Sequence, residues 1–265
     1  DVMQYITISS TGNAIDFGNL TIGRSSTASA ATNGRGLIAG GCCPRRDRID
    51  AITVATTGNA TDWGNMNNEN MDGAGCAGPV RTYFAGGENN STPITNDIVF
   101  VTIVSAANAF NFGNLTLARY GLASASNGTR GVWCSGAKQA SPNYSNNIDY
   151  ITFASLGDAT DFGDNNITVY QISGTGSTSR GIFAGGYSDD YGGSQNSISY
   201  VTIANTGNSS DFGDLTVARR GNAMSANETR ATISGGYNGS TYKSIDYITM
   251  SSTGNASDFG DLLAI

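Results

Sequence analysis

Aspartate is the residue type whose repetition in this sequence most directly suggests a chemistry. It recurs in an Asp-Phe-Gly or Asp-Trp-Gly phrase, with Asn in one copy, at Asp16, Asp62, Asn111, Asp161, Asp211 and Asp258. Another Asn or Asp follows three residues later, and oxygen ligands of this kind suit calcium. Calcium takes about six to eight ligands, however, and each copy supplies only two, so we expect turns in which side-chain oxygens accept backbone N–H bonds. We therefore predict no metal site.

Arginine is repeated in two sets. The first set opens a phrase of apolar residues that ends in Gly-Gly, at Arg35, Arg81, Arg130, Arg180 and Arg230. A ring of guanidinium groups would suit an anion, but their presence in every repeat favours a scaffold role, with bonds to the repeated aspartates and to loop carbonyls. The second set is missing from alternate repeats, so ring closure does not require it, and it is the better candidate for a function. Its members are Arg24, Arg119 and Arg219.

Acid–base and nucleophilic catalysis lack their commonest participant, because the 265 residues include no histidine. Ser-His-Asp triads and Cys-His pairs are thereby excluded. Carboxylate pairs occur only at repeated scaffold positions, which does not suggest the single pair of a glycosidase. The cysteines Cys42, Cys43, Cys76 and Cys134 fit no zinc spacing, so we expect free thiols or buried apolar residues, with one disulfide as the alternative. We predict no enzymatic activity and no cofactor.

The loops that follow the Gly-Gly phrases vary, unlike the rest of the repeat. They read CCPRRDR, ENNSTPITN, AKQASPNYSN, YSDDYGGSQN and YNGSTYK. Binding residues tend to lie on loops held by a rigid scaffold, and a mixture of Tyr, Asn, Ser and Asp suits a sugar. We expect these loops to gather on one face, together with the segments that enter the innermost strands. The candidate ligand-binding residues are Arg45, Arg46, Asn90, Tyr144, Tyr187, Asp189, Asp190, Tyr191, Tyr237 and Tyr242.

Two phrases carry the internal repeat that must position these residues. The first, TGNATDWG at residues 57–64, occurs in six versions, the last being TGNASDFG at residues 253–260. The second, RGIFAGG at residues 180–186, occurs in five versions, one of them the weaker RGVWCSG. Strands of the pattern apolar–Thr–apolar recur every 46 to 50 residues. Such a period is typical of solenoids, propellers and arrays.

Each repeat shows strand signals only. YITIS alternates apolar and polar residues, which predicts a strand, and a Gly-containing turn suited to a hairpin follows it. A short segment with one aromatic residue, a segment of small alternating residues and the apolar Gly-Gly phrase complete the unit. Four short strands without helical periodicity predict one blade of a propeller. We therefore predict an all-β protein, a single β-propeller domain over residues 1–265 with four-stranded antiparallel blades.

The order of these phrases resembles kelch-type β-propeller repeats over nearly the full length. The wording IDYIT, TGNASDFGDL and RGIFAGG is similar to propeller repeats in virion structural proteins of tailed cyanophages, such as tail, fibre or capsid-associated proteins. The resemblance implies that the small alternating segment is innermost, followed by the Gly-Gly strand, the YITI strand and the Asp-Phe-Gly strand. Copper oxidases with kelch-like propellers use histidine ligands, which this chain lacks. Ser135 and Gly136 replace the Gly-Gly pair in the third repeat, which predicts an altered inner turn there.

The inner strand pairs set the blade count, because they line the channel. Five inner pairs lie at residues 22–41, 69–87, 117–136, 169–186 and 217–236. Six outer hairpins lie at residues 4–18, 50–64, 99–113, 149–163, 199–213 and 246–260. We predict five blades, with a six-bladed ring, one blade being incomplete, as the alternative. The surplus hairpin in residues 1–20 would pack on the first blade, reach a neighbouring chain or end a preceding propeller, and we favour competition for, or extension of, the closing blade.

The composition disfavours two classes of partner, nucleic acids and membranes. The net charge is −7 and the basic residues are scattered, which disfavours nucleic acid, and no apolar run is long enough for membrane insertion. The resemblance implies a non-enzymatic structural or adhesive module of a virion, which presents its loops to a host-surface glycan or a neighbouring virion protein. The alternative is a free secreted lectin-like propeller. We expect a virion or extracellular location within a larger assembly, and the first residue, Asp1, indicates a processed or excised product.

Overall fold

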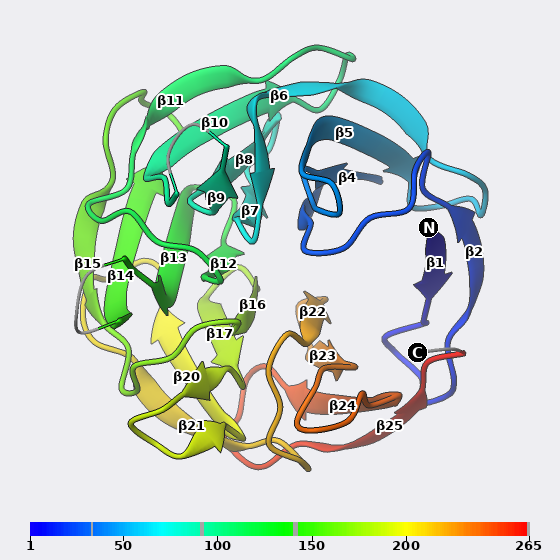
Figure 1. Ribbon diagram of the computed structural model, residues 1–265. Helices are drawn as coiled ribbons and strands as arrows, with labels where there is room; N and C mark the ends of the chain where they lie inside the picture. Colours follow the sequence, from blue (N-terminus) through cyan, green and yellow to red (C-terminus); the bar gives the residue numbers. More distant parts are fainter. Residues whose placement is uncertain (33, 91–92, 140–142, 264–265) are drawn as a thin grey trace.

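The computed structural model describes residues 1–32, 34–90, 93–139 and 143–263. All regular structure in this part of the chain is β, so it contains no helix that could span a membrane. Five antiparallel sheets formed by these residues, four of them four-stranded and one with a short fifth strand, surround a central axis as the blades of a β-propeller (Figure 1). The prediction of an all-β, five-bladed propeller is therefore confirmed.

Each blade runs from an innermost strand at the channel to an outermost strand at the rim. Blade 1 contains, in this order, β3 (Ala28–Thr32), β4 (Arg35–Ala39), β5 (Arg46–Thr53) and β6 (Thr61–Met71). Blade 2 contains β7 (Ala74–Ala77), β8 (Arg81–Ala85), β10 (Asp97–Thr102) and β11 (Phe110–Asn114). Blade 3 contains β12 (Ala123–Ser126), β13 (Arg130–Ala137), β14 (Tyr144–Thr152) and β15 (Thr160–Asp164). Blade 4 contains β16 (Ser173–Gly176), β17 (Arg180–Ala184), β20 (Ser197–Thr202) and β21 (Ser210–Asp214), and blade 5 contains β22 (Ala223–Ala226), β23 (Arg230–Ser234), β24 (Ser244–Thr249) and β25 (Ser257–Asp261).

Five short strands lie outside this pattern. The strand β9 (Glu88–Asn89) adds to the end of β6, and β18 (Tyr187–Ser188) pairs with β19 (Gly193–Ser194) in a small hairpin. The N-terminal strands β1 (Val2–Tyr5) and β2 (Ile15–Asn19) form a two-stranded sheet of their own. The strand order within each blade is the one that the kelch-like resemblance implied.

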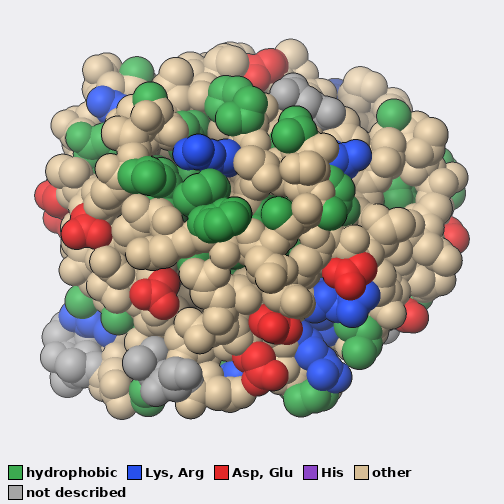
Figure 2. All heavy atoms as spheres, turned by 90° about the horizontal axis from the view of Figure 1, so that it is seen from above, with side chains coloured by type: hydrophobic (Ala, Val, Ile, Leu, Met, Phe, Trp, Pro, Cys, Tyr) green, Lys and Arg blue, Asp and Glu red, His purple; other side chains and the backbone are tan. Residues whose placement is uncertain are grey.

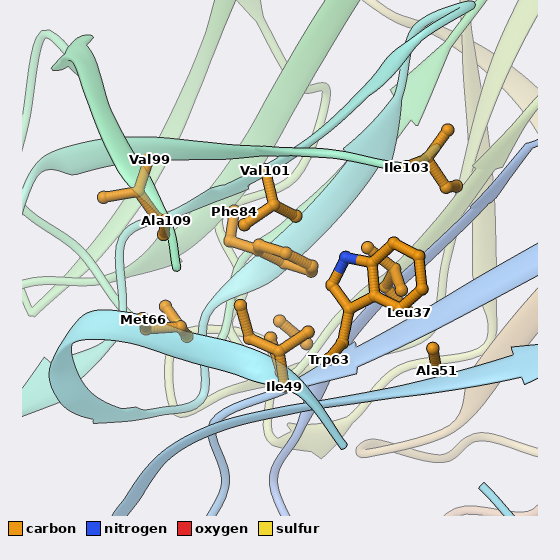
Figure 3. Packing of buried hydrophobic residues seen from close by; sticks show 12 residues of the cluster. Leu37, Ile49, Ala51, Trp63, Met66, Phe84, Val99, Val101, Ile103 and Ala109 are labelled. Atoms are coloured by element: carbon orange, nitrogen blue, oxygen red, sulfur yellow. The ribbon is translucent and has the colours of Figure 1, made fainter. Parts of the chain in front are cut away.

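The hydrophobic core lies between neighbouring blades rather than in the channel. Between blades 1 and 2, Leu37 and Ile49 pack with Phe84 and Val101, and all four are at most 1% exposed (Figure 3). These side chains alternate along their strands with residues that point to the other face of the sheet, as the period-2 pattern predicts. Equivalent clusters follow between the later blades, so each blade is stabilised by contact with the next.

The repeated TGN phrase joins each outer hairpin to the preceding outer strand. Between blades 4 and 3, the Gly207 N–H donates to the Phe162 carbonyl at 2.7 Å, and the Asn208 side chain accepts from the Asp164 N–H at 2.9 Å. A Cβ on Gly163, whose φ is +143°, would lie 2.6 Å from the backbone of Gly207, so only glycine permits this approach. We call this arrangement the interblade clasp. It is the structural purpose of the phrase.

The N-terminal hairpin β1–β2 lies in the outer ring between blades 5 and 1 (Figure 1, dark blue). Its Gly12 N–H donates to the Phe259 carbonyl of blade 5 at 2.9 Å, while the Gly58 N–H of blade 1 donates to the Phe17 carbonyl at 2.7 Å. The hairpin therefore makes one clasp on each side, as every complete blade does. It forms its own sheet and does not extend β25 or β6.

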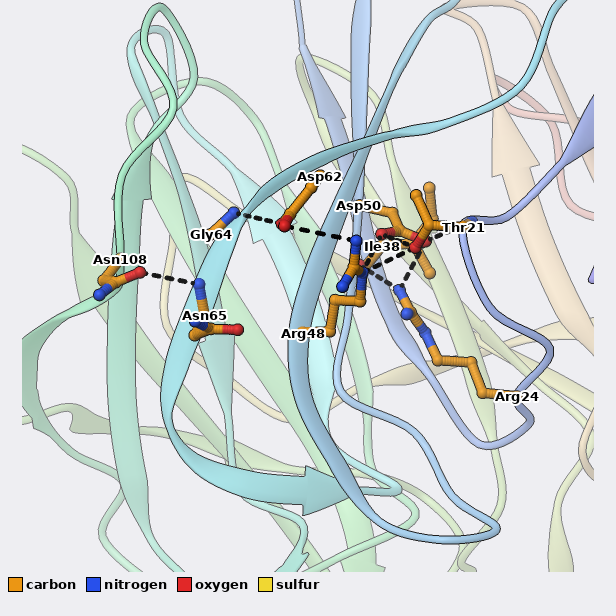
Figure 4. A network of polar contacts seen from close by, with 9 residues as sticks. All are labelled: Thr21, Arg24, Ile38, Arg48, Asp50, Asp62, Gly64, Asn65 and Asn108. Carbon is orange, nitrogen blue, oxygen red and sulfur yellow. Dashed lines mark hydrogen bonds and ion pairs between the residues drawn. The ribbon is translucent and has the colours of Figure 1, made fainter.

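Buried ion pairs explain the arginines that occur in alternate repeats. Arg24, Arg119 and Arg219 pair with Asp50, Asp149 and Asp246 at 3.2, 2.9 and 2.7 Å, and all six side chains are at most 1% exposed. In the first copy the Thr21 hydroxyl donates to Asp50 at 2.6 Å and Arg24 donates to the Ile38 carbonyl (Figure 4). This set, which the sequence made the better candidate for a function, is thus part of the scaffold.

The arginines that open the second strand of each blade have a different partner from the one expected. Arg180 lies over the Tyr200 ring, 4.7 Å from its centroid, and donates to the Met250 carbonyl of the next blade at 2.8 Å. The bond to a loop carbonyl was predicted, but the pairing with the aspartates of the Asp-Phe-Gly phrases was wrong. Among the described residues, the only one of those aspartates in an ion pair is Asp62, which meets Arg48 at 3.3 Å and accepts the Gly64 N–H.

The third blade keeps its inner turn despite the exchange of Gly for Ser. Ser135 has a φ of +58°, in the left-handed region that Gly occupies in the other blades. The strand β13 continues past it to Ala137 with a bulge. The predicted alteration is therefore limited to a longer strand, and the buried Ser135 hydroxyl accepts a hydrogen bond from Asn165 at 3.0 Å.

Candidate ligand-binding surface

The topology places the variable loops and the entry segments on one face of the propeller. The second strand of each blade ends, and its innermost strand begins, on this side. Backbone bridges connect the two segments in four blades, as between Tyr170 and Tyr187 or Arg220 and Tyr237. We call this side the loop face. It contains all ten of the candidate ligand-binding residues.

Four tyrosines, Tyr120, Tyr144, Tyr170 and Tyr187, form a cluster on the loop face over blades 3 and 4, and we call it the tyrosine cluster. Tyr144 stacks on Tyr170 with 5.2 Å between ring centroids and an interplanar angle of 6°. Tyr120 and Tyr187 approach Tyr170 edge to face at 6.0 and 5.8 Å. All four rings are partly exposed, so they present an apolar but accessible surface.

Asp189 is fixed at the edge of the tyrosine cluster. The hydroxyls of Tyr144 and Tyr187 each donate to one of its carboxylate oxygens at 2.8 Å. These two bonds lower the pKa of Asp189, because they stabilise its charged form. Burial, followed by the bond to Asp189, raises the pKa of Tyr144, while the bond to Asp189 is the main cause of the raised pKa of Tyr187. At neutral pH the site therefore holds an oriented carboxylate between two neutral phenols.

Arg220 extends the tyrosine cluster toward blade 5. Its guanidinium lies 4.4 Å from the Tyr187 ring centroid and 5.5 Å from that of Tyr237. Beyond it lies a hollow of about 460 Å³ lined by Tyr237, Tyr242 and Leu262 among others. The surface from blade 3 to blade 5 thus combines aromatic faces, one carboxylate and one guanidinium.

A second hollow, of about 450 Å³, lies on the loop face over blades 1 to 3. Arg45 forms an ion pair with Glu88 at 2.7 Å and donates to the side chain of Asn90 at 3.1 Å. Tyr120 and Lys138 line its other side. The structure therefore brings Arg45 and Asn90 together, with Tyr120 shared between this hollow and the tyrosine cluster.

The remaining candidates are less closely integrated. Arg46 begins β5 and is half-buried, and Asp190 is exposed beside Asp189. Tyr191 is 52% exposed at the tip of the β18–β19 hairpin. These three residues lie on the loop face but do not contribute contacts to the tyrosine cluster in the described part of the chain.

Sequence reasoning missed three residues of this surface, Tyr120, Tyr170 and Arg220. Each follows directly after a buried residue of its entry segment, namely Arg119, Val169 or Arg219. Alternation after the Asp-Phe-Gly strand was the available signal, since a residue next to a buried one points the other way in an extended segment. The segments as a whole were expected on this face, but their side chains were not singled out.

The outer rim has its own apolar cluster, which packs on the blade. Figure 2 shows the rim on the side of β6 and β11, where hydrophobic side chains gather beside basic ones within a mostly polar surface. Phe110 in β11 is 59% exposed and packs on Phe100 at 5.8 Å. Phe100 in turn lies under Arg81, so this cluster extends the repeated cation–π arrangement.

The cysteines and acidic residues add no reactive centre to the described surface. All four cysteines are free thiols, and burial raises the pKa of the Cys134 thiol to about 12. No three His, Cys, Asp or Glu side chains gather as a metal site requires within the described residues.

The chain matches no protein-family model, and no curated protein matches it significantly.

Proposed function

We propose that the protein is a non-enzymatic binding module whose loop face holds a carbohydrate over blades 3 to 5. The observation that carries this proposal is the Asp189 carboxylate, which Tyr144 and Tyr187 fix at 2.8 Å within a surface of partly exposed tyrosine rings. A sugar ring offers apolar C–H faces that pack on aromatic rings and hydroxyls that donate to a carboxylate. Both kinds of group are present within this one patch.

The electrostatics of the patch favour binding over catalysis. A general acid must be protonated near neutral pH, whereas the two phenol bonds lower the pKa of Asp189. The carboxylate thus serves as a hydrogen-bond acceptor for ligand hydroxyls, and Arg220 serves as a donor on the other side of Tyr187. This arrangement orients a neutral, polar ligand, and Asp189 does not act as a general acid in it.

The proposed setting is a virion, where the propeller would present its loop face to a host-surface glycan or a neighbouring virion protein. This part of the proposal comes from the resemblance of the repeated phrases to phage structural proteins. A free secreted lectin would use the same surface in the same way. The location would be the virion or the extracellular space in either case.

A glycan array followed by calorimetry on the hits tests the proposal. We expect Asp189→Asn and Tyr187→Ala to weaken binding about tenfold or more, since hydrogen bonds to charged groups contribute about 1.5–3 kcal/mol. Asp190→Asn is the matched control, because it removes the neighbouring exposed charge and leaves the patch intact. Binding that survives Asp189→Asn unchanged would contradict the proposed site. Absence of glycan binding, together with a tight contact to another virion protein, would favour an architectural role.

A further inference from the structure

The outer ring of this propeller has six places, although the described residues form five complete blades. Five of the clasp contacts join Gly18 to Gly58, Gly64 to Ala107, Gly113 to Gly157, Gly163 to Gly207 and Gly213 to Gly254. The sixth joins Gly260 to Gly12, so the contacts run around the ring without a break. The hairpin β1–β2 therefore occupies the outer half of the sixth place. We call the inner half of that place, between the inner edge of β1 and the inner half of blade 5, the sixth-place opening.

The inner edge of β1 is the first boundary of the sixth-place opening. In blade 5, β24 pairs on its outer side with β25 and on its inner side with β23, from Ile245 opposite Ser234 to Thr249 opposite Arg230. The strand β1 has the same outer register, with Val2 opposite Asn19 and the same bulge. Among the described residues it has no inner partner strand, so β1 ends at Tyr5, whereas β24 continues for two further residues.

Side chains of β1 are uncovered where their equivalents are buried. Met3 occupies the position of Ile49, Ile98, Ile148, Ile198 and Ile245, each of which is 0% exposed, but Met3 itself is partly exposed. Tyr5 is 37% exposed. Ile6 is also partly exposed, while its equivalent Ile248 in blade 5 is 3% exposed. The residue types thus follow the pattern of a strand covered on its inner side.

The other boundary of the sixth-place opening is the inner half of blade 5. In blade 3 the innermost strand β12 is largely buried, but Ala223 and Ser225 of β22 are exposed. A Cβ on Gly121 would lie 2.9 Å from the Gln171 nitrogen of the next blade, whereas nothing lies within 4 Å of the same position on Gly221. The next entry segment, which covers these groups in blade 3, has no counterpart beside blade 5 among the described residues.

The hydrogen bonding of the second Gly in each Gly-Gly pair also differs between blade 5 and the other blades. The N–H groups of Gly41, Gly87, Gly136 and Gly186 each donate to a carbonyl of the next entry segment, at 2.7 to 3.0 Å. Gly236 makes no such bond within the described residues. It lines the hollow of about 460 Å³, together with Gly221 and Leu262. The hollow is therefore the position that an entry segment takes in the other blades.

We propose that the sixth-place opening is a docking site for a two-stranded polypeptide segment with the pattern of the chain's own inner pairs. Such a segment consists of small alternating residues, a turn, and then Arg, apolar residues and Gly-Gly. Its second strand forms backbone hydrogen bonds with the inner edge of residues 3–7, as strand addition at an open sheet edge does. Its arginine lies over Tyr5, as Arg230 lies over Tyr247 at 4.6 Å, and donates to blade 1 at Val54, as Arg230 donates to the Ile8 carbonyl.

The ring itself favours this occupant over others. The clasps hold β1 at the same outer register as the third strands of the blades, so the edge that it presents has the same spacing and twist. An occupant with another pattern would leave Met3 and Ile6 without apolar cover or the Gly236 N–H without a partner. The principal contacts of this occupant are on β1, but its entry segment would also fill the hollow beside Tyr237 and Tyr242, which the proposed carbohydrate surface shares.

A synthetic peptide tests the proposal. The peptide copies residues 215–236 and is added to the full chain, with backbone amide exchange as the readout. We expect saturable one-to-one binding, exchange of residues 3–7 slowed at least about tenfold, and a melting temperature raised by about 5 °C. A peptide with Ile233→Lys and Gly235→Val is the matched control and should produce none of these three effects.

Two protein variants separate docking from nonspecific adhesion. Met3→Lys places a charge where the apolar face of the occupant would lie and should abolish protection, while the control Val2→Lys changes a side chain that is already 62% exposed.

Because an isolated peptide is itself prone to self-associate, a second arm of the experiment appends residues 219–236 after Ile265, which raises the local concentration of the segment to about the millimolar range. Unchanged exchange at residues 3–7 in both arms would overturn the proposal. So would protection by a second copy of the chain without any added segment, seen as a dimer in sedimentation.

Discussion

The side chain of Asn13 accepts a hydrogen bond at 3.0 Å from the backbone N–H of Asp261, 248 residues later in the chain. The same bond joins Asn208 to Asp164, between blades 4 and 3, and Asn255 to Asp214, between blades 5 and 4. The N-terminal hairpin is therefore held to blade 5 by the same contact that holds each blade to its neighbour. This relationship closes the outer ring and leads directly to the first prediction.

Deletion of residues 1–18 should destabilise the protein substantially. It removes Gly12, Ala14 and Phe17, which make three of the four backbone bonds to blades 5 and 1 at 2.7 to 2.9 Å. Each such bond contributes about 1 kcal/mol, and packing adds to this, so we expect the melting temperature to fall by roughly 10 °C. Light scattering should also detect association through the apolar side chains that the deletion uncovers on blade 5, such as Phe259. A chain that melts unchanged and stays in its original assembly state would show that the hairpin is dispensable.

Replacement of a clasp glycine should lower the free energy of unfolding. In Gly163→Ala the new Cβ would meet the backbone of Gly207 at 2.6 Å, and the φ of +143° is itself unfavourable for alanine. We expect a loss of about 1–3 kcal/mol in the free energy of unfolding, measured by urea denaturation. Gly23→Ala is the control, because its Cβ would meet only ordinary contacts at 3.6 Å or more. Equal stability of the two variants would argue against the clasp.

The buried ion pairs should be costly to break and easier to replace. Asp149→Ala leaves the guanidinium of Arg119 buried without its carboxylate partner, which lies at 2.9 Å in the wild type. We expect a loss of about 3–5 kcal/mol in the free energy of unfolding, whereas the double variant Arg119→Met, Asp149→Leu should lose less because no unpaired charge stays buried. Denaturant unfolding measures both variants, and the exposed change Asp190→Ala serves as the control. A double variant less stable than Asp149→Ala would contradict this expectation.

The Asp189 carboxyl should titrate below its ordinary value near 3.8, since the Tyr144 and Tyr187 hydroxyls stabilise its charged form. A group whose pKa is lowered on folding contributes stability above its unfolded pKa, and this contribution is lost as the pH falls through the folded pKa. We therefore expect ligand binding to be constant from neutral pH to about pH 5 and to weaken only under stronger acid. Carbon-13 NMR titration measures the pKa directly. Tyr144→Phe should raise it, whereas Tyr191→Phe should not.

The repeat itself was sufficient to predict the architecture. The alternation in YITIS, the turns and the Gly-Gly phrase set the strands, and a period of 46 to 50 residues set the blade. Each of these signals is local, because strand direction and turn conformation depend on residues close together in the chain. Five inner phrases gave five blades for the same reason. The variable loops reached one face because every blade runs in the same order.

The partners of the repeated side chains were decided only in three dimensions. Arg180 donates to Met250, 70 residues away, and Asp189 accepts from Tyr144, 45 residues away, so neither spacing could be read from one repeat. The same holds for the place of the N-terminal hairpin. Whether six outer hairpins close one ring depends on the angle that each blade occupies around the axis, and packing between blades sets that angle. The sequence by itself determined the unit and its order, and tertiary packing decided that the N-terminal hairpin lies between blades 5 and 1 at a sixth place.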